Sequence, residues 1–170
     1  MKAIHIAELS GRFTVRRLGR NDVKKIVGLC AGNPQFYQYS LAEPTEGQVI
    51  SDMSILPPGV PPSRKYYVGF LEGNALVAVM DLIDGYPDAD TAFIGFFMLA
   101  RERHGRGIGS AMIAEALAYL TALGYSAVRL CIDEGNPQST AFWIRNGFRV
   151  LKRIQREKGC VLLAERPLSV

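Results

Sequence analysis

The sequence lacks any apolar run long enough to cross a membrane. Such a helix needs roughly 20 consecutive apolar residues, and no stretch of the 170 residues approaches that length. The first residues, MKAIHIAELSGRF, include Glu8 and no long apolar core, so they do not resemble a secretory signal. We therefore expect no membrane association and a cytoplasmic location.

Cysteine and histidine are also scarce. Cys30, Cys131 and Cys160 are odd in number and lack the CxxC spacing of many metal sites. We expect neither a disulfide framework nor structural zinc, which favours a reducing compartment. His5 and His104 are too few and too far apart for a histidine-based metal site, so we expect no metal.

Charge of one sign does not dominate the sequence. There are 20 Lys and Arg residues and 16 Asp and Glu residues, which gives a net charge of +4. The basic residues are spread along the chain except for one small cluster, which consists of Arg101, Arg103, His104 and Arg106. Nucleic-acid binding needs a basic patch or stripe, so we expect no nucleic-acid partner and at most one local anion site.

The length and composition predict one domain that spans residues 1–170. Apolar residues make up 48% and charged residues 21%, the balance of a globular protein. Neither a repeat nor a linker divides the chain. The proline-rich segment 57–62 can be neither helix nor central strand, so we expect a surface connection there.

Periodicity predicts seven strands and four helices. The segments typical of strands are 13–18, 65–71, 75–83, 91–99, 127–132, 148–154 and 160–164. Helical spacing and caps mark 21–33, 44–56, 110–123 and 136–147, with the aromatic residues 36–39 between the first two helices. Along the chain, the strands first follow one another as hairpins and later alternate with helices as β-α-β. This order implies a mixed sheet with helices on both sides. Segment 91–99 is nearly all apolar, so we expect it to be central and covered on both faces.

Three glycines, Gly105, Gly107 and Gly109, lie between the strand 91–99 and the helix 110–123. Glycine lets the backbone adopt positive φ and approach a ligand closely, and amides at a helix N-terminus bind phosphate. This pattern indicates a pyrophosphate site, although an ordinary strand-to-helix turn is the alternative. A dinucleotide fingerprint fails because Ser110 or Met112 occupies its last glycine position, and the Walker A pattern is absent.

Two segments resemble the signatures of one enzyme family. Residues 104–109 (HGRGIG) resemble the Q/R-x-x-G-x-G/A coenzyme A loop of the GNAT superfamily of N-acetyltransferases. Residues 136–148 (NPQSTAFWIRNGF) resemble its second signature, an Asn followed by a short helix that ends in Gly-Phe. The spacing between the signatures agrees, as does the element order from about residue 13 to residue 164. The chain is therefore identified as a member of this superfamily.

The resemblance implies an α/β (mixed α+β) fold. Its central mixed, mostly antiparallel sheet would have about six to seven strands and helices on both faces. It also implies acetyl-CoA as co-substrate and direct acetyl transfer to a primary amine of a small molecule or peptide, without a covalent intermediate. The expected partner is thus an amine, and the expected state is a monomer or a homodimer.

The coenzyme residues follow from the same resemblance. Backbone groups of Phe97, Met98 and Leu99 would pair with the pantetheine arm, and a backbone N–H of Met98 or Leu99, with Leu99 preferred, would polarise the thioester carbonyl. Asn136 would reach the pantetheine or adenosine, and Phe142 would pack beside the coenzyme. For the three strand residues the alternative is plain strand core. For Asn136 it is a simple helix N-cap, and for Phe142 it is ordinary core. The pyrophosphate would sit on the amides of His104, Gly105, Arg106, Gly107, Ile108, Gly109 and Ser110.

Three positions depart from the family pattern. His104 replaces the opening Gln or Arg of the loop but can still donate a hydrogen bond. Trp143 stands where many members have a Tyr that protonates the leaving thiolate. An indole N–H donates a hydrogen bond without delivering a proton, so Trp143 would stabilise a thiolate or wall the pocket. Phe93 occupies the position of a Glu general base found in some members.

The acceptor side is less defined. Asp81 interrupts the apolar strand 75–83, and a buried carboxylate there needs a partner. We expect Asp81 to be a base or an amine anchor. The alternatives are a structural hydrogen-bonding role and simple exposure to solvent. The carboxylates from 81 to 90 favour a cationic acceptor. Weaker candidates are Asp52, Asp84 and Tyr86, together with Tyr37 and Tyr39 at the acceptor mouth, and Cys131 is expected to be a buried structural thiol rather than a nucleophile.

Two other functions stay open at this point. One is a non-catalytic acyl-CoA-binding or sensor module, which the absence of the usual Tyr permits. The other is a nucleotide-binding domain that uses the glycine loop.

Overall fold

The computed structural model describes residues 2–40 and 42–169, so Met1, Leu41 and Val170 of the expected domain 1–170 lie outside the described residues. The chain forms a seven-stranded sheet of order β1-β2-β3-β4-β5-β7-β6. Only β4 and β5 pair in parallel, whereas the other neighbours are antiparallel. The strands are β1 (Thr14–Arg17), β2 (Lys65–Glu72), β3 (Ala75–Asp84), β4 (Thr91–Leu99), β5 (Ala127–Asp133), β6 (Arg149–Gln155) and β7 (Cys160–Pro167).

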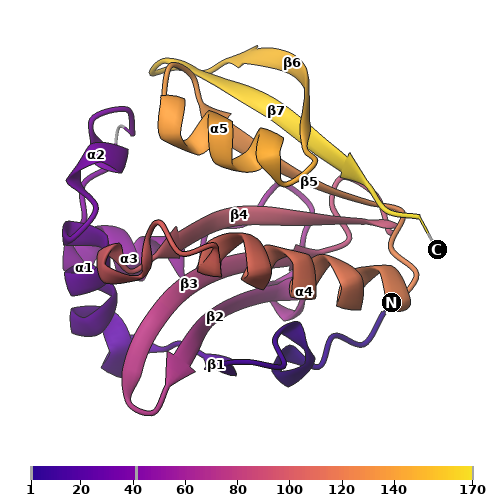
Figure 1. Ribbon diagram of the computed structural model, residues 1–170. Helices are drawn as coiled ribbons and strands as arrows, with labels where there is room; N and C mark the ends of the chain where they lie inside the picture. The colour runs from indigo at the N-terminus through magenta and orange to yellow at the C-terminus, as the bar shows by residue number, and fades with distance from the viewer. Residues whose placement is uncertain (1, 41, 170) are drawn as a thin grey trace.

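Helices cover both faces of this sheet (Figure 1). They are α1 (Val23–Ala31), α2 (Pro34–Tyr37), α3 (Glu46–Asp52), α4 (Ile108–Ala122) and α5 (Pro137–Arg145), with short 3-10 turns η1 (Ile6–Leu9), η2 (Arg20–Asp22), η3 (Pro62–Arg64) and η4 (Arg101–Arg103). One core cluster joins α4 and α5 to one face of the sheet, and a second joins α1 and α3 to the other. The predicted fold class is confirmed. Within the described ranges, no helix has the length and apolar character needed to span a membrane.

The helix α4 follows from its residue pattern. Ile108, Met112, Ile113, Leu117 and Leu120 recur at helical spacing, and all are buried. The helix begins two residues earlier than predicted, after Gly107. It ends before Gly124, whose φ of +85° is the left-handed conformation that commonly terminates helices.

The segment between α1 and β2 differs from its prediction. The aromatic residues expected as a plain connection begin inside α2, a four-residue helix that opens with Pro34 at its first turn. The helix predicted for 44–56 ends at Asp52. Leu56 precedes Pro57, and a residue before proline is disfavoured in helical conformation. The chain therefore leaves the helix before it reaches the proline segment.

The strands β4 and β5 pair over only part of their length. Their register joins Thr91–Ile94 to Ala127–Leu130 and goes no further. On the other side of β4, the register with β3 skips Gly95, which makes a bulge opposite Asp81 and Leu82. β4 is central, as expected. Full cover on both faces was wrong, because Gly95 is exposed and Phe96 and Phe97 are half-buried where the two strands diverge.

One face of the sheet is covered over only half its width. The core cluster built by α1 and α3 reaches β2, β3 and β4, and no residue of β5, β6 or β7 is among its described members. On that face, the register aligns three rows across these last strands. They are Arg129–Glu165–Arg149, Cys131–Leu163–Lys152 and Asp133–Val161–Ile154. A broad strip of strand side chains is thus left open beside the divergence of β4 and β5.

Candidate active site

Two adjoining cavities lie where β4 and β5 diverge. The smaller, about 560 Å³, borders the glycine loop and the end of β4. The larger, about 800 Å³, extends over the open strip of β5, β6 and β7 and under α2 and α3. Four residues line both, namely Phe36, Phe97, Ser139 and Trp143. The two spaces therefore meet at one junction.

The glycine loop forms a cradle at the start of α4. Gly105 and Gly107 have φ of +75° and +73°, and a Cβ at either would meet no atom within 4 Å. Glycine is thus required there by backbone conformation and not by crowding. The amides that follow Gly107 open a 15-residue helix, and the first N–H groups of a helix have no acceptor within it. The loop can therefore hold an anion.

Most of the predicted loop residues line this smaller cavity. His104, Gly105, Gly107, Ile108, Gly109 and Ser110 do so, together with Phe97, Met98 and Leu99 of β4. Arg106 is exposed and does not line either cavity. Gly109 has its own reason to be glycine, since a Cβ there would lie 3.3 Å from the ring of Phe142. It lets α5 approach α4 closely.

The carbonyl of Leu99 fixes the start of the loop. It accepts a hydrogen bond from Asn33 Nδ2 at 3.1 Å and lies 3.0 Å from His104 Nε2. Because a carbonyl oxygen only accepts hydrogen bonds, the Nε2 atom of His104 carries the ring proton. Asn33 is buried and also donates to the Leu29 carbonyl at 3.0 Å. Sequence reasoning assigned Asn33 only to the end of a helix, so its link to β4 was missed. No sequence pattern signals a contact over 66 residues.

An aromatic cluster closes the junction. Phe142 stacks on Phe97 with ring centroids 6.0 Å apart, and Trp143 meets Phe142 edge-on at 4.9 Å and Phe148 at 5.1 Å. Trp143 is buried. Such packing fixes the position of the indole at the wall between the two cavities.

Asn136 and Asn146 hold the two ends of α5. Asn136 is buried, lines the smaller cavity and accepts from Ser139 N at 3.0 Å, which confirms the helix-cap interpretation. Asn146 was not foreseen. Its Nδ2 donates to Ser110 Oγ at 3.1 Å and to the Phe142 carbonyl at 2.8 Å. It thereby ties the end of α5 to the first turn of α4.

Asp81 lies in the larger cavity with a buried partner. Lys65 Nζ donates to Asp81 Oδ2 at 2.8 Å and to the Ile55 carbonyl at 2.6 Å. Oδ1 of Asp81 is buried and has no partner among the described residues. Burial raises the pKa of Asp81, and Lys65 opposes that rise. A Cβ at Gly95 would lie 2.6 Å from Asp81 Oδ2, so the absence of a side chain at Gly95 makes room for this carboxylate.

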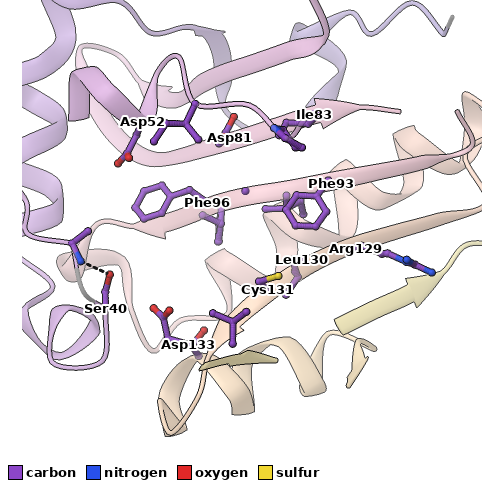
Figure 2. Close-up of a pocket in the computed structure, with 18 of the residues that line it drawn as sticks. Ser40, Asp52, Asp81, Ile83, Phe93, Phe96, Arg129, Leu130, Cys131 and Asp133 are labelled. Carbon is purple, nitrogen blue, oxygen red and sulfur yellow. Dashed lines mark hydrogen bonds between the residues drawn. The ribbon is translucent and has the colours of Figure 1, made fainter. Parts of the chain in front are cut away.

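Asp52 is the second carboxylate on this side of the larger cavity. It is half-buried, and its Oδ1 accepts from Gln48 Nε2 at 2.8 Å. Burial raises its pKa. Figure 2 shows Asp52 and Asp81 on one side of the cavity, with Cys131 and Asp133 across from them.

Other acidic candidates point elsewhere. Asp84 is buried, accepts a hydrogen bond from Tyr125 and lines neither cavity. Asp90 pairs with Lys2 at 2.7 Å, and Asp88 accepts from Thr91 at 3.0 Å. Of the carboxylates from 81 to 90, only Asp81 faces the larger cavity.

The aromatic candidates divide in the same way. Tyr37 and Tyr86 line the larger cavity, and burial raises the pKa of Tyr37. Tyr39 is exposed and lines neither cavity. Phe93 also lies in the larger cavity.

Cys131 is half-buried in the wall of this cavity, not fully buried as expected. Arg156 Nη2 lies 3.7 Å from its sulfur. Burial still outweighs this cation and raises the pKa of the thiol. Because the thiolate is the nucleophilic form, the environment disfavours a nucleophilic role, in line with the sequence analysis.

Three basic residues on the open strip were not singled out from the sequence. Arg129, Lys152 and Arg156 line the larger cavity opposite Asp52 and Asp81. Strand alternation in 127–133 gives Arg129 and Cys131 a common face, but the contribution of β6 depends on register. In the ranges 2–40 and 42–169, no group of three or more His, Cys, Asp or Glu side chains is arranged to hold a metal ion.

A family model described as the acetyltransferase (GNAT) family matches residues 34–148 of this chain. The match covers more than half of the chain and includes the glycine loop, β4 and α5. A comparison with curated protein sequences finds no match.

Many solved structures have a similar fold. An acetyltransferase from Thermus thermophilus superposes with a TM-score of 0.72 at 21% identity, over 92% of this chain and 97% of the other. The PaiA N-acetyltransferase from Thermoplasma acidophilum, solved with coenzyme A, gives 0.64 at 16% identity over 91% and 98%. A phosphinothricin acetyltransferase from Sinorhizobium meliloti, solved with acetyl-CoA, gives 0.63 at 20% identity over 92% and 88%. At these identities the likeness concerns the fold.

Proposed function

Because the chain belongs to the GNAT family of acetyltransferases, we propose that it transfers an acetyl group from acetyl-CoA to the primary amine of a small molecule or peptide. The observation that carries the proposal is the meeting of two cavities at Phe97 and Trp143, one beside an anion cradle and one beside a buried carboxylate. A direct transfer needs two substrates to meet at such a junction. A single domain, a cytoplasmic location and a monomeric or homodimeric state belong to the same proposal.

The smaller cavity has the features that acetyl-CoA requires. The open glycine cradle before α4 would receive the pyrophosphate. The backbone of Phe97–Leu99 would receive the pantetheine arm, since β4 has no strand partner on that side beyond Ile94 in the described register. Asn136 and Phe142 would form the wall. The coenzyme supplies an activated thioester, so the protein needs only to orient the amine, polarise the carbonyl and accept a proton.

The alternation of the β3–β4 ladder indicates which backbone groups are free. Ala100 N donates to the Val77 carbonyl at 2.8 Å, and bonded pairs alternate along an antiparallel ladder. Met98 therefore faces β3, whereas Phe97 and Leu99 face the gap. Leu99 lies beside the glycine loop, and Phe97 lines both cavities. We assign the N–H of Leu99 to the pantetheine arm and that of Phe97 to carbonyl polarisation, in place of the Leu99 role expected from the sequence.

Asp81 is the acidic group of the acceptor side. Its unpartnered Oδ1 can accept a hydrogen bond from an amine, and Lys65 favours its ionised form. We propose it as the amine anchor or the base. The C–N bond forms as the C–S bond breaks, and the proton lost by the amine balances the thiolate released. Trp143 would wall the junction, with water carrying the proton to the thiolate.

A non-catalytic acyl-CoA-binding module is the second candidate. The observation that favours it is the buried indole of Trp143, which cannot deliver a proton at the junction. Turnover with any amine would exclude this candidate.

Calorimetric titration with acetyl-CoA, with free CoA for comparison, tests the coenzyme site first. We expect micromolar or tighter binding to both. A panel of amines monitored by thiol release then tests transfer. Failure to bind acetyl-CoA would exclude both candidate functions, transferase and sensor. Binding without turnover would exclude the transferase function and leave the sensor function.

A further inference from the structure

Most charged residues of the larger cavity are divided by sign between its two walls, although Asp133 lies on the same wall as the basic residues. Asp52 and Asp81 come from α3 and β3, and Lys152 and Arg156 come from β6 and the turn that follows it. Figure 2 shows Asp52 and Asp81 across the cavity from Cys131 and Asp133. This separation of charge is not explained by acetyl transfer alone.

The acidic wall can hold an ammonium group. Asp81 is 8% exposed, and its Oδ1 finds no partner within the described chain, although such an atom is costly to bury unpaired. Asp52 stands beside it with one oxygen occupied by Gln48. Lys65 compensates one of the two negative charges. An ammonium group bound here would therefore face the remaining charge of Asp52 and the unpartnered Oδ1 of Asp81.

The basic wall retains positive charge after its internal pairs are considered. Arg129 is paired with Glu165 at 2.6 Å. Lys152 and Arg156 have no carboxylate within 4.0 Å among the described residues, although Arg156 is close enough to Asp133 to oppose its burial-raised pKa. Arg156 extends to within 3.7 Å of the Cys131 sulfur. Cys131 and Lys152 both pair with Leu163, so they lie in the same row across the strip. Both cations therefore flank the middle of the open strip.

The surface between the two walls is largely apolar. Phe93 and Phe96 lie on the β4 side, and Val161, Leu163 and Ile154 lie on the strip. An occupant that spans the cavity therefore meets an acidic end, an apolar middle and a basic end. A simple alkylamine would make no contact with the charges of the basic end.

We propose that the acceptor is an amine that also carries a carboxylate, with an apolar body between the two charges, which is the chemistry of an ω-amino acid. The inference rests on the proposed function and specifies its substrate class. The amine lies against Asp81 near the junction, and the carboxylate lies against Lys152 and Arg156. The acceptor is thus oriented by two charges of opposite sign.

Matched acceptors test this assignment. Phenylalanine, phenylalaninamide and phenethylamine share one body, as do 6-aminohexanoate, 6-aminohexanamide and hexylamine, with a longer spacing between the charges. Hydrogen bonds to charged groups contribute about 1.5–3 kcal/mol, so we expect kcat/KM for 6-aminohexanoate to exceed that of its amide by roughly 10-fold or more. Phenylalanine, whose two charges share one carbon, should show the smaller preference over its amide. Binding of each compound is measured by calorimetry in the presence of free CoA, which does not require turnover.

Variants assign the preference to the wall. Lys152→Gln and Arg156→Gln should each reduce the acid-to-amide ratio toward one. Arg153→Gln is the matched control, because Arg153 neighbours Lys152 on the same strand but pairs with Glu134 at 2.7 Å and lines neither cavity. It should keep the ratio of the unaltered protein.

The outcomes separate this inference from the proposed function. Acetylation of amides or simple amines at rates equal to the acids would overturn the inference and leave the transferase proposal intact. Equal or absent binding of acid and amide in the presence of CoA would overturn it as well. Failure of the protein to bind acetyl-CoA would instead remove the proposed function.

Discussion

Lys65 bridges Asp81 to the stretch just before the proline segment, since its ammonium lies 2.8 Å from Asp81 Oδ2 and 2.6 Å from the Ile55 carbonyl. Both side chains of the pair are almost fully buried, at 5% and 11% exposure. One cation thus favours ionisation of the buried carboxylate and contacts a segment that lines the same cavity. The pair is accordingly the most informative target for mutation.

Asp81→Asn should lower turnover and leave acetyl-CoA affinity almost unchanged, because Asp81 lines the larger cavity and not the smaller one. Loss of a proton acceptor costs roughly 100- to 10,000-fold in rate, and loss of an amine anchor alone costs less. Steady-state kinetics and calorimetry with acetyl-CoA measure the two effects. Unchanged kinetics would remove Asp81 from the site.

Lys65→Met should move the acidic limb of the pH–rate profile to higher pH. Burial already raises the pKa of Asp81 and Lys65 opposes that rise, so removing the ammonium raises the pKa further and protonates the carboxylate at higher pH. The kcat/KM profile measures the shift. Breaking a buried ion pair also costs about 3–5 kcal/mol of stability, whereas Lys2→Met at the solvent-exposed Lys2–Asp90 pair should cost much less.

If Lys65→Met fails to fold, the pH dependence of stability tests the same carboxylate. A folded-state pKa raised above 3.8 means that the folded protein binds the proton more tightly than the unfolded chain. The contribution of Asp81 to stability is therefore greatest at low pH and declines as pH rises from about 3.8 through the raised value. Urea titrations should show the unaltered protein losing stability relative to Asp81→Asn over that range. Parallel curves would mean that the pKa is not raised.

Gly107→Ala should weaken acetyl-CoA binding. Its φ of +73° is unfavourable for alanine by roughly 1–2 kcal/mol, and relaxation of that strain moves the amides of the cradle. Gly59→Ala is a matched control, since Gly59 has φ of +79°, also has open space for a Cβ, and lines neither cavity. Thermal denaturation should show similar losses for both variants, and calorimetry should show an affinity loss for Gly107→Ala alone. Equal affinities would mean that the loop does not hold the coenzyme.

Trp143→Phe should retain turnover within about threefold, because the proposed part of the indole is to wall the junction and not to transfer a proton. Trp143→Ala should reduce stability by about 3–5 kcal/mol, as expected for a large buried aromatic side chain. Denaturant unfolding and thiol-release assays separate the two. A large loss of turnover in the folded Phe variant would assign the N–H of Trp143 a direct part in the reaction.

Long periodic segments were predictable from the sequence, whereas short ones were not. The pattern of Ile108, Met112 and Leu120 extends over several turns, so α4 was found to within two residues. The four residues of α2 are too few to show a period. The end of α3 could have been placed earlier, because Leu56 stands before a proline.

The site was partly predictable for a similar reason. The glycine loop is local in sequence, and all its predicted residues except Arg106 line the smaller cavity. Asp81 and Asp84 are an odd number of residues apart on one strand and so point to opposite faces, which explains why only Asp81 reaches the larger cavity. Lys152 reaches that cavity, and Lys65 reaches Asp81, through strand register, which is set by pairing between distant segments. Arg156 follows β6 directly and depends on the same pairing. Sequence patterns carry no such information about pairing.

Only four described residues line both cavities, and this division has a consequence for how the protein can change. The smaller cavity is built mainly from two contiguous stretches, residues 97–110 and 136–145, and the larger is built from residues scattered over most of the strands and helices and their connections. Under the proposed function, substitutions on the open strip can therefore alter the acceptor while the cavity proposed for acetyl-CoA keeps its lining. The two cavities are in this sense separate modules. Directed evolution could vary the lining of the larger cavity without changing the residues of the smaller one.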